Sequence, residues 1–533
     1  MLSSLLKSTG ITEPLMPAAA MKLANDIAAA TGWRPYVTSF VAIHGTVFFL
    51  ARRGTDKRLC LLWKKGTTPD LLAGFCGERF AASIGGVECE CQVGYLDHTN
   101  ALGLRKHFAF LRPKVMGVRP AFGAGDRLGL ATPAHVRAVR GTGLAPFFAQ
   151  QSIREMTRTG RTPDQVLDSA VFGVFQEGWR DGFGADADHL KTTADIDATA
   201  AAGFTMFTID PGDHVDNAAQ AADMSVLKDK LAALPWPALE IHSEDLCRRF
   251  IGQSCRLPDD NVVAMDEEAF FRAAAKYGRA LAHTAAMHRH LESVMGSRPF
   301  DSAQGRPFEL EMSVDETATP TSVAEHVFVA SELRRLGVEW VSLAPRFVGE
   351  FEKGVDYIGD LAEFERTFAQ HVAVAQHFGP YKISIHSGSD KFSIYPIAAR
   401  LTGNLIHLKT AGTSYLEALR AIAKIDPALF REILGFAIER YPTDRASYHV
   451  SAEVAKVPRP AVLADDELAG VLDQFDGREV LHVTFGSVLT AETEGKPRFK
   501  DRLMRALESS EEVHYETVRA HIEKHVRPFA VAR

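Results

Sequence analysis

From about residue 115 onward, short apolar runs alternate with stretches of helical periodicity, and this alternation constrains the fold more than any other feature. The helical stretches, such as 322–337 and 361–379, carry apolar residues at i, i+3 and i+4 spacing. Strands that alternate with helices build a parallel sheet with right-handed crossovers. The candidate strands are 145–152, 183–191, 204–210, 308–316, 339–347, 381–389, 404–412 and 479–487. They predict an α/β fold, a closed (β/α)8 barrel of the TIM type.

Motifs and charge exclude several classes of partner. The sequence has no G-x-G-x-x-G after an early strand and no G-x-x-x-x-G-K-[ST], which argues against a nucleotide-binding sheet. The net charge is -7, with acidic and basic residues mixed along all 533 residues, so nucleic acid is not expected as a partner. No stretch approaches the roughly 18 uninterrupted apolar residues of a membrane span. We therefore expect a soluble, cytoplasmic protein without a membrane partner.

Residues 1–115 differ in texture from the rest of the chain. They contain β-branched and aromatic runs separated by glycines and charged turns, which predicts a small N-terminal α+β module. A Gly- and Pro-rich passage at 115–135 marks the boundary of that module. The catalytic barrel is then expected over 116–533. An Ala-rich, mostly helical stretch at about 217–300 is predicted to be an insertion in the barrel.

Three histidines lie inside predicted apolar strands, near the ends where barrel enzymes keep their catalytic groups: His189, His386 and His407. A single strand histidine is more often a buried core residue. Three of them beside the carboxylates of Asp188 and Glu311 instead favour a bound divalent metal ion. No H-x-H or H-E-x-x-H spacing defines the ligand set, so the identity of the metal (Zn, Mn, Ni or Fe) stays open.

Asp188 directly precedes His189. Neighbours on a strand point to opposite faces, so both side chains reach one site only if the strand is already turning into its loop. A carboxylate beside a metal-bound imidazole can act as a general acid/base on a hydroxyl that the metal polarises. The alternative is an aspartate that caps the following helix or turn.

Basic and hydroxyl side chains near the same strand ends are candidates for binding an anionic sugar. An arginine fork fits a carboxylate bidentately, and a Ser-Gly-Ser loop can bind an anion through backbone N–H groups. For any single lysine a solvated place at the barrel rim is the simpler interpretation. The predicted substrate-binding residues are Asp126, Arg127, Gln151, Arg154, Lys191, Asp210, Ser387, Ser389, Asp390, Lys391 and Lys409.

Four longer motifs resemble one known family. "GDRLGLATP" (125–133), "QQSIREMTRTGRTP" (150–163), "FGADADHLKT" (183–192) and "KISIHSGSDKFSIYPIAA" (382–399) are together similar to the tagaturonate epimerase family. The resemblance runs over most of residues 115–490. The Asp-His step in "ADHLK" is also similar to metal-dependent class II aldolases, which are barrels too.

The resemblance implies interconversion of D-tagaturonate and D-fructuronate, two ketohexuronates, with a divalent metal ion. The carbon that is inverted is C4, whose hydroxyl is β to the ketone, so the ketone does not acidify its C–H bond. A retro-aldol route avoids this difficulty: the C3–C4 bond breaks, the aldehyde rotates and the bond re-forms. By analogy with aldolases, His189 is expected to bind the metal and Asp188 to act as the acid/base.

The other roles follow from position at the barrel rim. His386 and His407 are expected as further metal ligands, and Glu311 as a fourth ligand or a second acid/base. Arg127, Arg154, Lys191 and Lys391 are expected to bind the substrate carboxylate. Two alternatives stay open: a class II-type ketose aldolase that releases its cleavage products, and a non-catalytic sugar-binding accessory subunit. A homo-oligomer is compatible with the sequence.

Overall fold

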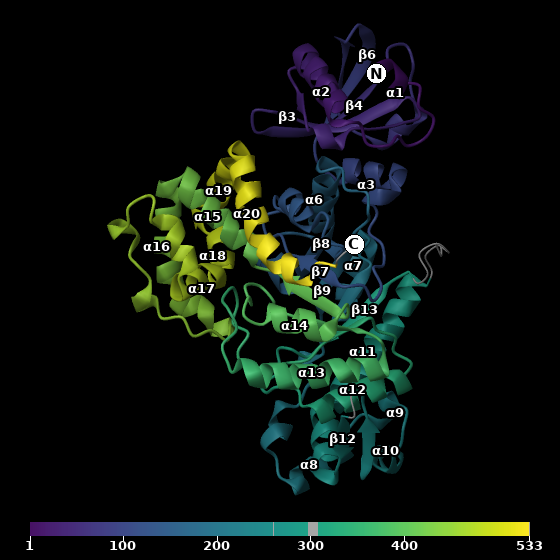
Figure 1. Ribbon diagram of the computed structural model, residues 1–533, viewed down its shortest axis with the longest axis vertical. Coiled ribbons are helices and arrows are strands. Elements are labelled where there is room, and N and C mark those ends of the chain that lie inside the picture. The colour runs from purple at the N-terminus through teal and green to yellow at the C-terminus, as the bar shows by residue number, and fades with distance from the viewer. Residues whose placement is uncertain (259–260, 297–306, 532–533) are drawn as a thin grey trace.

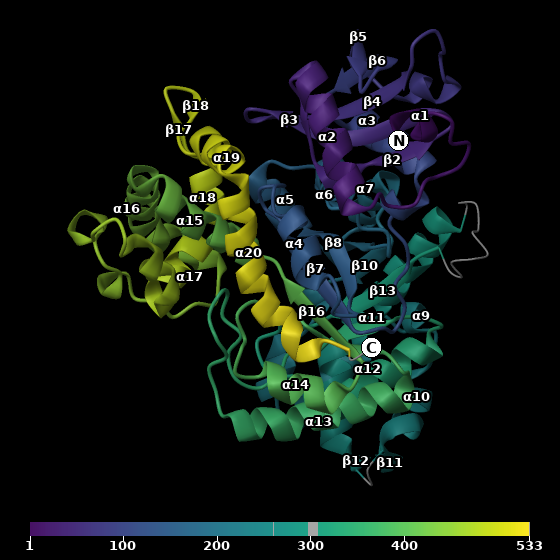
Figure 2. The same ribbon diagram turned by 45° about the horizontal axis from the view of Figure 1, so that its top comes forward.

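The computed structural model describes residues 1–258, 261–296 and 307–531. Its centre is a closed barrel of parallel strands in consecutive order, with the last strand pairing with the first (Figures 1 and 2). The predicted α/β barrel is therefore confirmed. The strands are β7 (Ala121–Ala124), β8 (Ala145–Ser152), β9 (Gly184–Leu190), β10 (Met206–Ile209), β13 (Glu309–Ser313), β14 (Ser342–Ala344), β15 (Lys382–Ile385) and β16 (Ile406–Thr410).

One of the eight predicted strands is wrong. Residues 479–487 belong to two helices, α17 (Phe475–Val483) and α18 (Phe485–Thr490). The residues of α17 from Gly477 to Val483 are all buried, including Arg478, Glu479 and His482, so this stretch has no exposed face to set a helical period. The missing strand is β7, which lies inside the Gly- and Pro-rich passage at 115–135. A Cβ on its Gly123 would lie 2.8 Å from Oε1 of Gln150, so the glycine leaves room for this side chain in its present position.

Helices surround the barrel, and side-chain caps define where several of them begin. Thr162, Thr192 and Ser322 each accept from the third backbone N–H of their helix and form a capping box with Gln165, Asp195 or Glu325. The surrounding helices are α4 (Thr132–Val139), α5 (Ile153–Thr159), α6 (Pro163–Gln176), α7 (Thr193–Ala202), α11 (Glu267–Met295), α12 (Val323–Arg335), α13 (Leu361–Phe378), α14 (Tyr395–Thr402) and α15 (Thr413–Ile425).

The N-terminal part is an antiparallel sheet beside the barrel (Figure 1). Alternate residues of β3 face opposite sides: Phe48 packs with the core that includes the barrel helices, and Phe49 packs with α2 (Pro17–Thr31). The sheet is thus covered on both faces. Its strands are β1 (Arg34–Pro35), β2 (Val41–Ile43), β3 (Thr46–Arg53), β4 (Asp56–Lys64), β5 (Glu78–Ile84) and β6 (Val87–Gly94); helices α1 (Leu2–Leu5) and α3 (His98–His107) flank it.

Between β10 and β13 the chain forms a mostly helical segment, drawn at the bottom of Figure 1. The predicted insertion at 217–300 falls here, although residues 297–300 lie outside the described part of the chain. The segment contains α8 (Met224–Ala232), α9 (Trp236–Leu239), α10 (Ser243–Phe250), a hairpin of β11 (Gln253–Arg256) and β12 (Val262–Met265), and α11.

After β16 the chain builds a helical lobe with a hydrophobic core of its own. Its final helix, α20 (Glu511–Val526), leaves this lobe and runs beside α4 and α15 along the barrel (Figure 2). Within the described residues, we find no helix that combines the length and the hydropathy needed to cross a bilayer. The remaining elements are α16 (Pro427–Asp444), the short hairpin of β17 (Glu492–Thr493) and β18 (Lys496–Pro497), and α19 (Lys500–Ser509).

Candidate active site at the carboxyl end of the barrel

Asp188 and His189 both face the same cleft at the end of β9. The pairing of β9 with β10 shifts by one residue between Ala187 and Leu190, so β9 holds one residue more than its partner there. His189 has a left-handed backbone with φ 53°. Because of this bulge, the consecutive side chains of Asp188 and His189 face one site, as expected where a strand turns into its loop. The alternative of a purely capping Asp188 is not what the structure shows, because its carboxylate pairs with Lys409 at 3.0 Å.

The imidazoles of His189 and His386 face each other. Nε2 of His189 lies 3.2 Å from Nδ1 of His386. The outer nitrogen of each ring is held by a carboxylate: Nδ1 of His189 lies 3.3 Å from Asp210, and Nε2 of His386 lies 2.6 Å from Glu311. Burial opposes charge on both rings, but nearby carboxylates, Asp188 for His189 and Asp315 for His386, raise the pKa of His189 to about 9 and that of His386 to about 10. A bound cation would replace the inner protons, because with the outer nitrogens as donors the two inner nitrogens would direct lone pairs towards a common point.

This arrangement fits a divalent transition metal. Ligand atoms of Asp188, His189 and His386 all lie within 4.8 Å of one another. Two imidazoles and a carboxylate are a common donor set for such ions, and metal-binding histidines usually donate their other N–H to a carboxylate. Asp315 adds a further carboxylate 3.4 Å from Nδ1 of His386.

The structure does not bring His407 to these residues. His407 and Lys409 point into the barrel from the same face of β16, and His407 lies one layer deeper, beside Phe147 and 3.5 Å from Oε2 of Glu311. Burial lowers the pKa of His407 to about 3, so the ring is neutral. We therefore regard His407 as a core residue below the site rather than as a ligand.

Lys409 joins three carboxylates beneath the cleft. Its amine lies 2.7 Å from Asp186, 3.0 Å from Asp188 and 2.8 Å from Glu311. Burial alone would lower its pKa, but the three carboxylates together raise it well above the usual value. In return, Lys409 and the nearby histidines hold the pKa of Asp188 below its usual value despite burial, whereas burial raises the pKa of Asp186 to about 6. Asp188 is therefore ionised and can accept a proton.

Two adjoining cavities form the cleft above these residues. The inner one, of about 40 Å³, is lined by Asp188, His189 and Lys409, and the outer one, of about 250 Å³, opens beyond His386. Sequence reasoning missed two of the residues that line both, because they lie in loops that follow no predicted strand end closely. The shared lining residues are Arg154, Lys353, His386, Ser387 and Tyr448.

Comparison with known proteins shows the family of this chain. A family model described as tagaturonate epimerase matches residues 36–529. The chain belongs to the tagaturonate epimerase family. It is 44% identical over 495 residues to a tagaturonate/fructuronate epimerase of Thermotoga maritima, with 93% of this chain and 96% of that protein covered.

Solved structures support the same membership. Crystal structures of fructuronate-tagaturonate epimerase from Cohnella laeviribosi, one native and one with glycerol, are 36% identical to this epimerase. Each has a TM-score of 0.86 and covers 97% of this chain and 100% of the other. This similarity extends over the barrel, the N-terminal sheet and the C-terminal helices alike.

Arg127 is the predicted substrate-binding residue whose surroundings best suit an anion. Its Nε and Nη2 donate to Oε1 of Glu155 at 2.8 and 2.7 Å, and its guanidinium lies 3.6 Å from the ring centre of Phe485. Its buried Nη1 has no hydrogen-bond partner among the described residues, although Arg127 lines the inner cavity. Arg154 also lines the cleft of the epimerase, where it pairs with Glu316 at 2.7 Å.

Several other predicted substrate-binding residues are used elsewhere. Asp126 accepts from the backbone N–H groups of residues 128, 129 and 131. Lys191 pairs with Asp213 at the surface, at 2.8 Å. Lys391 donates to backbone carbonyls, including that of Glu352 at 2.7 Å. In the described part of the chain, the inner and outer cavities of the cleft are likewise not lined by Gln151, Asp210 or Asp390. They are lined by Ser387 and Ser389.

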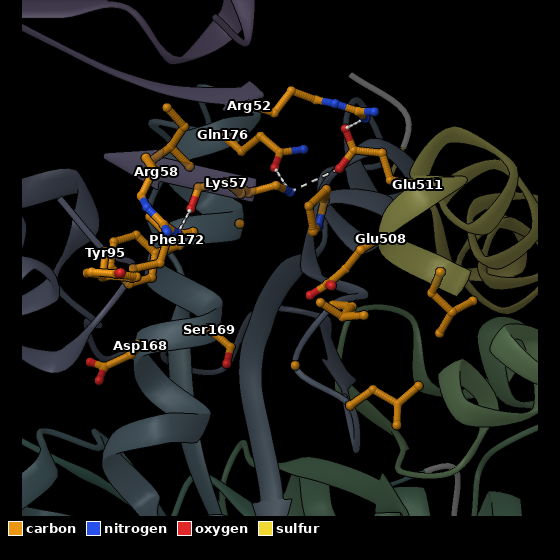
Figure 3. A pocket seen from close by; sticks show the side chains of 18 of the residues that line it. Arg52, Lys57, Arg58, Tyr95, Asp168, Ser169, Phe172, Gln176, Glu508 and Glu511 are labelled. Carbon is orange, nitrogen blue, oxygen red and sulfur yellow. Dashed lines mark hydrogen bonds and ion pairs between the residues drawn. The ribbon is translucent and has the colours of Figure 1, made fainter. Parts of the chain in front are cut away.

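A separate cavity of about 1240 Å³ lies between the N-terminal sheet, α6 and α20 (Figure 3). Its charged side chains largely pair with one another: Glu511 pairs with Arg52 and lies 3.1 Å from Lys57, and Lys57 also donates to Gln176 at 2.7 Å. None of the histidines of the candidate active site lines it. This cavity therefore lacks the paired imidazoles that make the barrel cleft the candidate active site.

Proposed function

We propose that this epimerase interconverts D-tagaturonate and D-fructuronate by breaking and re-forming the C3–C4 bond. The observation that carries the proposal is the meeting of ionised Asp188 with the paired imidazoles of His189 and His386 at the carboxyl end of the barrel. The names of the relatives from Thermotoga maritima and Cohnella laeviribosi support the choice of substrate.

His189 and His386 would hold a divalent metal ion, and we assign the neighbouring carboxylate of Asp188 to proton transfer instead of metal binding. When bound, such an ion supplies Lewis-acid stabilisation of negative charge on the substrate oxygens. Asp210 and Glu311 fix the two imidazoles by accepting from their outer nitrogens. We assign Glu311 this orienting role because it is fully buried beneath His386 and does not line either cavity of the cleft.

Asp188 is proposed as the acid/base. It takes the proton of the C4 hydroxyl, the C4–O bond becomes the carbonyl of an aldehyde, and the C3–C4 electrons form an enediolate on the other fragment. The aldehyde then rotates to present its opposite face. When the C3–C4 bond re-forms, Asp188 returns its proton to the C4 oxygen, so the net change is the inversion of C4. Lys409 keeps Asp188 ionised at the start of the cycle.

Arg127 is proposed to bind the carboxylate of the substrate. Among the described residues its Nη1 has no hydrogen-bond partner and is an available donor, and the ring of Phe485 packs against the guanidinium. His482 lies 3.4 Å from Nη2 of Arg127, and burial together with the nearby arginine keeps its pKa well below the usual value, so it adds no competing charge. A buried guanidinium discriminates a uronate from a neutral ketohexose.

The test is to incubate the enzyme with D-tagaturonate and follow D-fructuronate by NMR, with Arg127→Lys beside it. A lysine loses the forked contact, so kcat/KM for tagaturonate should fall by about 30-fold or more, equivalent to about 2 kcal/mol. Turnover of the neutral ketohexose tagatose should change much less. Lys191→Ala is the matched control and should behave as the parent, because Lys191 faces Asp213. Persistent free triose aldehyde without a C4 epimer would indicate an aldolase instead.

A further inference from the structure

The loop after β15 carries Ser387 and Ser389 into the cleft in an unusual backbone conformation. Ser387 has φ 48° and Asp390 has φ 63°, both in the left-handed region that non-glycine residues rarely adopt. Between the serines, a Cβ on Gly388 would lie 2.6 Å from Cδ1 of Leu408 and 2.8 Å from the carbonyl oxygen of Ile385. A loop held this tightly needs contacts that stabilise the strained conformation.

Asp390 supplies those contacts from the side of the loop that faces away from the cleft. Its Oδ2 lies 3.0 Å from Nη2 of Arg478, and its Oδ1 bonds to Nε2 of His521 on α20. Its backbone N–H donates to Nε2 of His525, one turn further along α20, at 2.9 Å. Arg478 continues to Glu417 of α15 at 2.9 Å. All five side chains are buried or nearly so.

These residues form a second cluster with the composition of a metal site, since Asp390, His521 and His525 also place ligand atoms within 4.8 Å of one another. Its lone pairs are already in use. Both oxygens of Asp390 are occupied, and Nε2 of His525 accepts from a backbone N–H. The guanidinium of Arg478 provides the positive charge that an ion would supply in the first cluster. We therefore interpret the second cluster as a network of ion pairs and hydrogen bonds that anchors the loop, and not as a metal site.

We infer that Asp390 and His521 are positioning residues, through which the C-terminal helix α20 holds Ser387 and Ser389 in the cleft. The inference rests on the proposed function in one respect, because it takes this cleft to be the place where the sugar binds. Neither residue touches that cleft, so they act on the reaction only through the loop. Ser387 also accepts from Lys353, which lines the outer cavity together with His386, so the position of this lysine depends on the same loop.

The test compares His521→Ala with His521→Gln, whose amide can still donate to Asp390. Hydrogen–deuterium exchange of the peptide that contains residues 386–391 reports the order of the loop, and steady-state assays with tagaturonate report catalysis. We expect faster exchange of this peptide in His521→Ala, and kcat/KM lower by roughly 10- to 100-fold with KM raised. His521→Gln should restore most of both, and bound metal should stay at the parental level.

His514→Gln is the control, since His514 is a buried histidine of the same helix that does not contact Asp390. Unchanged exchange of the loop in His521→Ala would overturn the inference, whether or not activity falls. If that variant does not fold, Asp390→Asn replaces it, because asparagine tolerates the left-handed backbone but loses the negative charge and one of the two acceptor oxygens that bind Arg478 and His521. A parent enzyme without epimerase activity would count against the proposed function alone, because the exchange measurement is independent of substrate.

Discussion

His189 shapes the site through its backbone conformation as well as through its side chain. The bulge in β9 and the positive φ of His189 turn two consecutive side chains into one cleft, and Asp210 then orients the imidazole. The sequence predicted Asp188, His189 and His386 correctly as neighbours because each ends a strand with a buried apolar run. Lys353 and Tyr448 escaped prediction because they come from long loops whose path depends on packing. His407 was misplaced because position along a strand does not reveal depth in a barrel.

Replacing His189 tests the metal site at this scale. His189→Asn is preferable to alanine, since asparagine tolerates φ 53° whereas alanine would add about 1 kcal/mol of strain. We expect the purified variant to lose its divalent metal by elemental analysis, and kcat/KM to fall by at least about 100-fold. His290→Asn, a partly exposed histidine bonded to Asp197, should keep both. Full metal content in His189→Asn would exclude His189 as a ligand.

A buried pair of carboxyl groups makes stability depend on pH. Burial and a hydrogen bond with Glu352 raise the pKa of Glu479 from 4.5 to about 8. Between about pH 5 and pH 8 the native state therefore keeps a proton on Glu479 that the unfolded state has already lost. The contribution of this group to stability falls as the pH rises through that window. The melting temperature of Glu479→Gln minus that of the parent should increase as the pH is raised from about 5 to about 9. For the exposed Glu439→Gln this difference in melting temperature should not change with pH. If it did not change with pH for Glu479→Gln either, the raised pKa of Glu479 would be refuted.

At the scale of elements, pattern reasoning succeeds where a short apolar run is bounded by polar residues and followed by a helical stretch. Seven of the barrel strands were found from apolar runs, but residues 479–487 were assigned to a strand because α17 is buried on all sides. The strand β7 was hidden because four residues, one of them glycine, are too short to show a period. The barrel closes through the pairing of β7 with β16, and a local sequence pattern carries no information on pairing between strands so far apart in the chain.

Two glycines in different elements predict opposite responses to the same substitution. Gly388→Ala places a methyl group against Leu408 and the carbonyl of Ile385, which should cost about 2 kcal/mol and lower the melting temperature. Gly435→Ala lies within α16, where the nearest atom to the new Cβ is 3.8 Å away on Pro460. It should stabilise the protein by about 0.5–1 kcal/mol. A Gly388→Ala variant that melts at or above the parental temperature would show that the loop has more freedom than its contacts indicate.

At the scale of the whole molecule, α20 connects regions that are distant in sequence. Near its start Glu511 accepts from Tyr36 and pairs with Arg52 and Lys57 of the N-terminal sheet (Figure 3). Further along, His521 reaches the active-site loop. Such pairing between the two ends of the chain leaves no trace in local periodicity, which is why the sequence did not predict it. The N-terminal sheet and the barrel cleft thus share one structural support.

The central claim is that C4 is inverted by cleavage of the C3–C4 bond in the cleft of Asp188, His189 and His386. The most direct measurement is the conversion of tagaturonate in deuterium oxide, with NMR of the isolated fructuronate. Because the C4–H bond is never broken in this route, the product should carry protium at C4 after many turnovers. Deuterium at C4 would show that a base removes the C4 hydrogen, and would contradict the proposed mechanism.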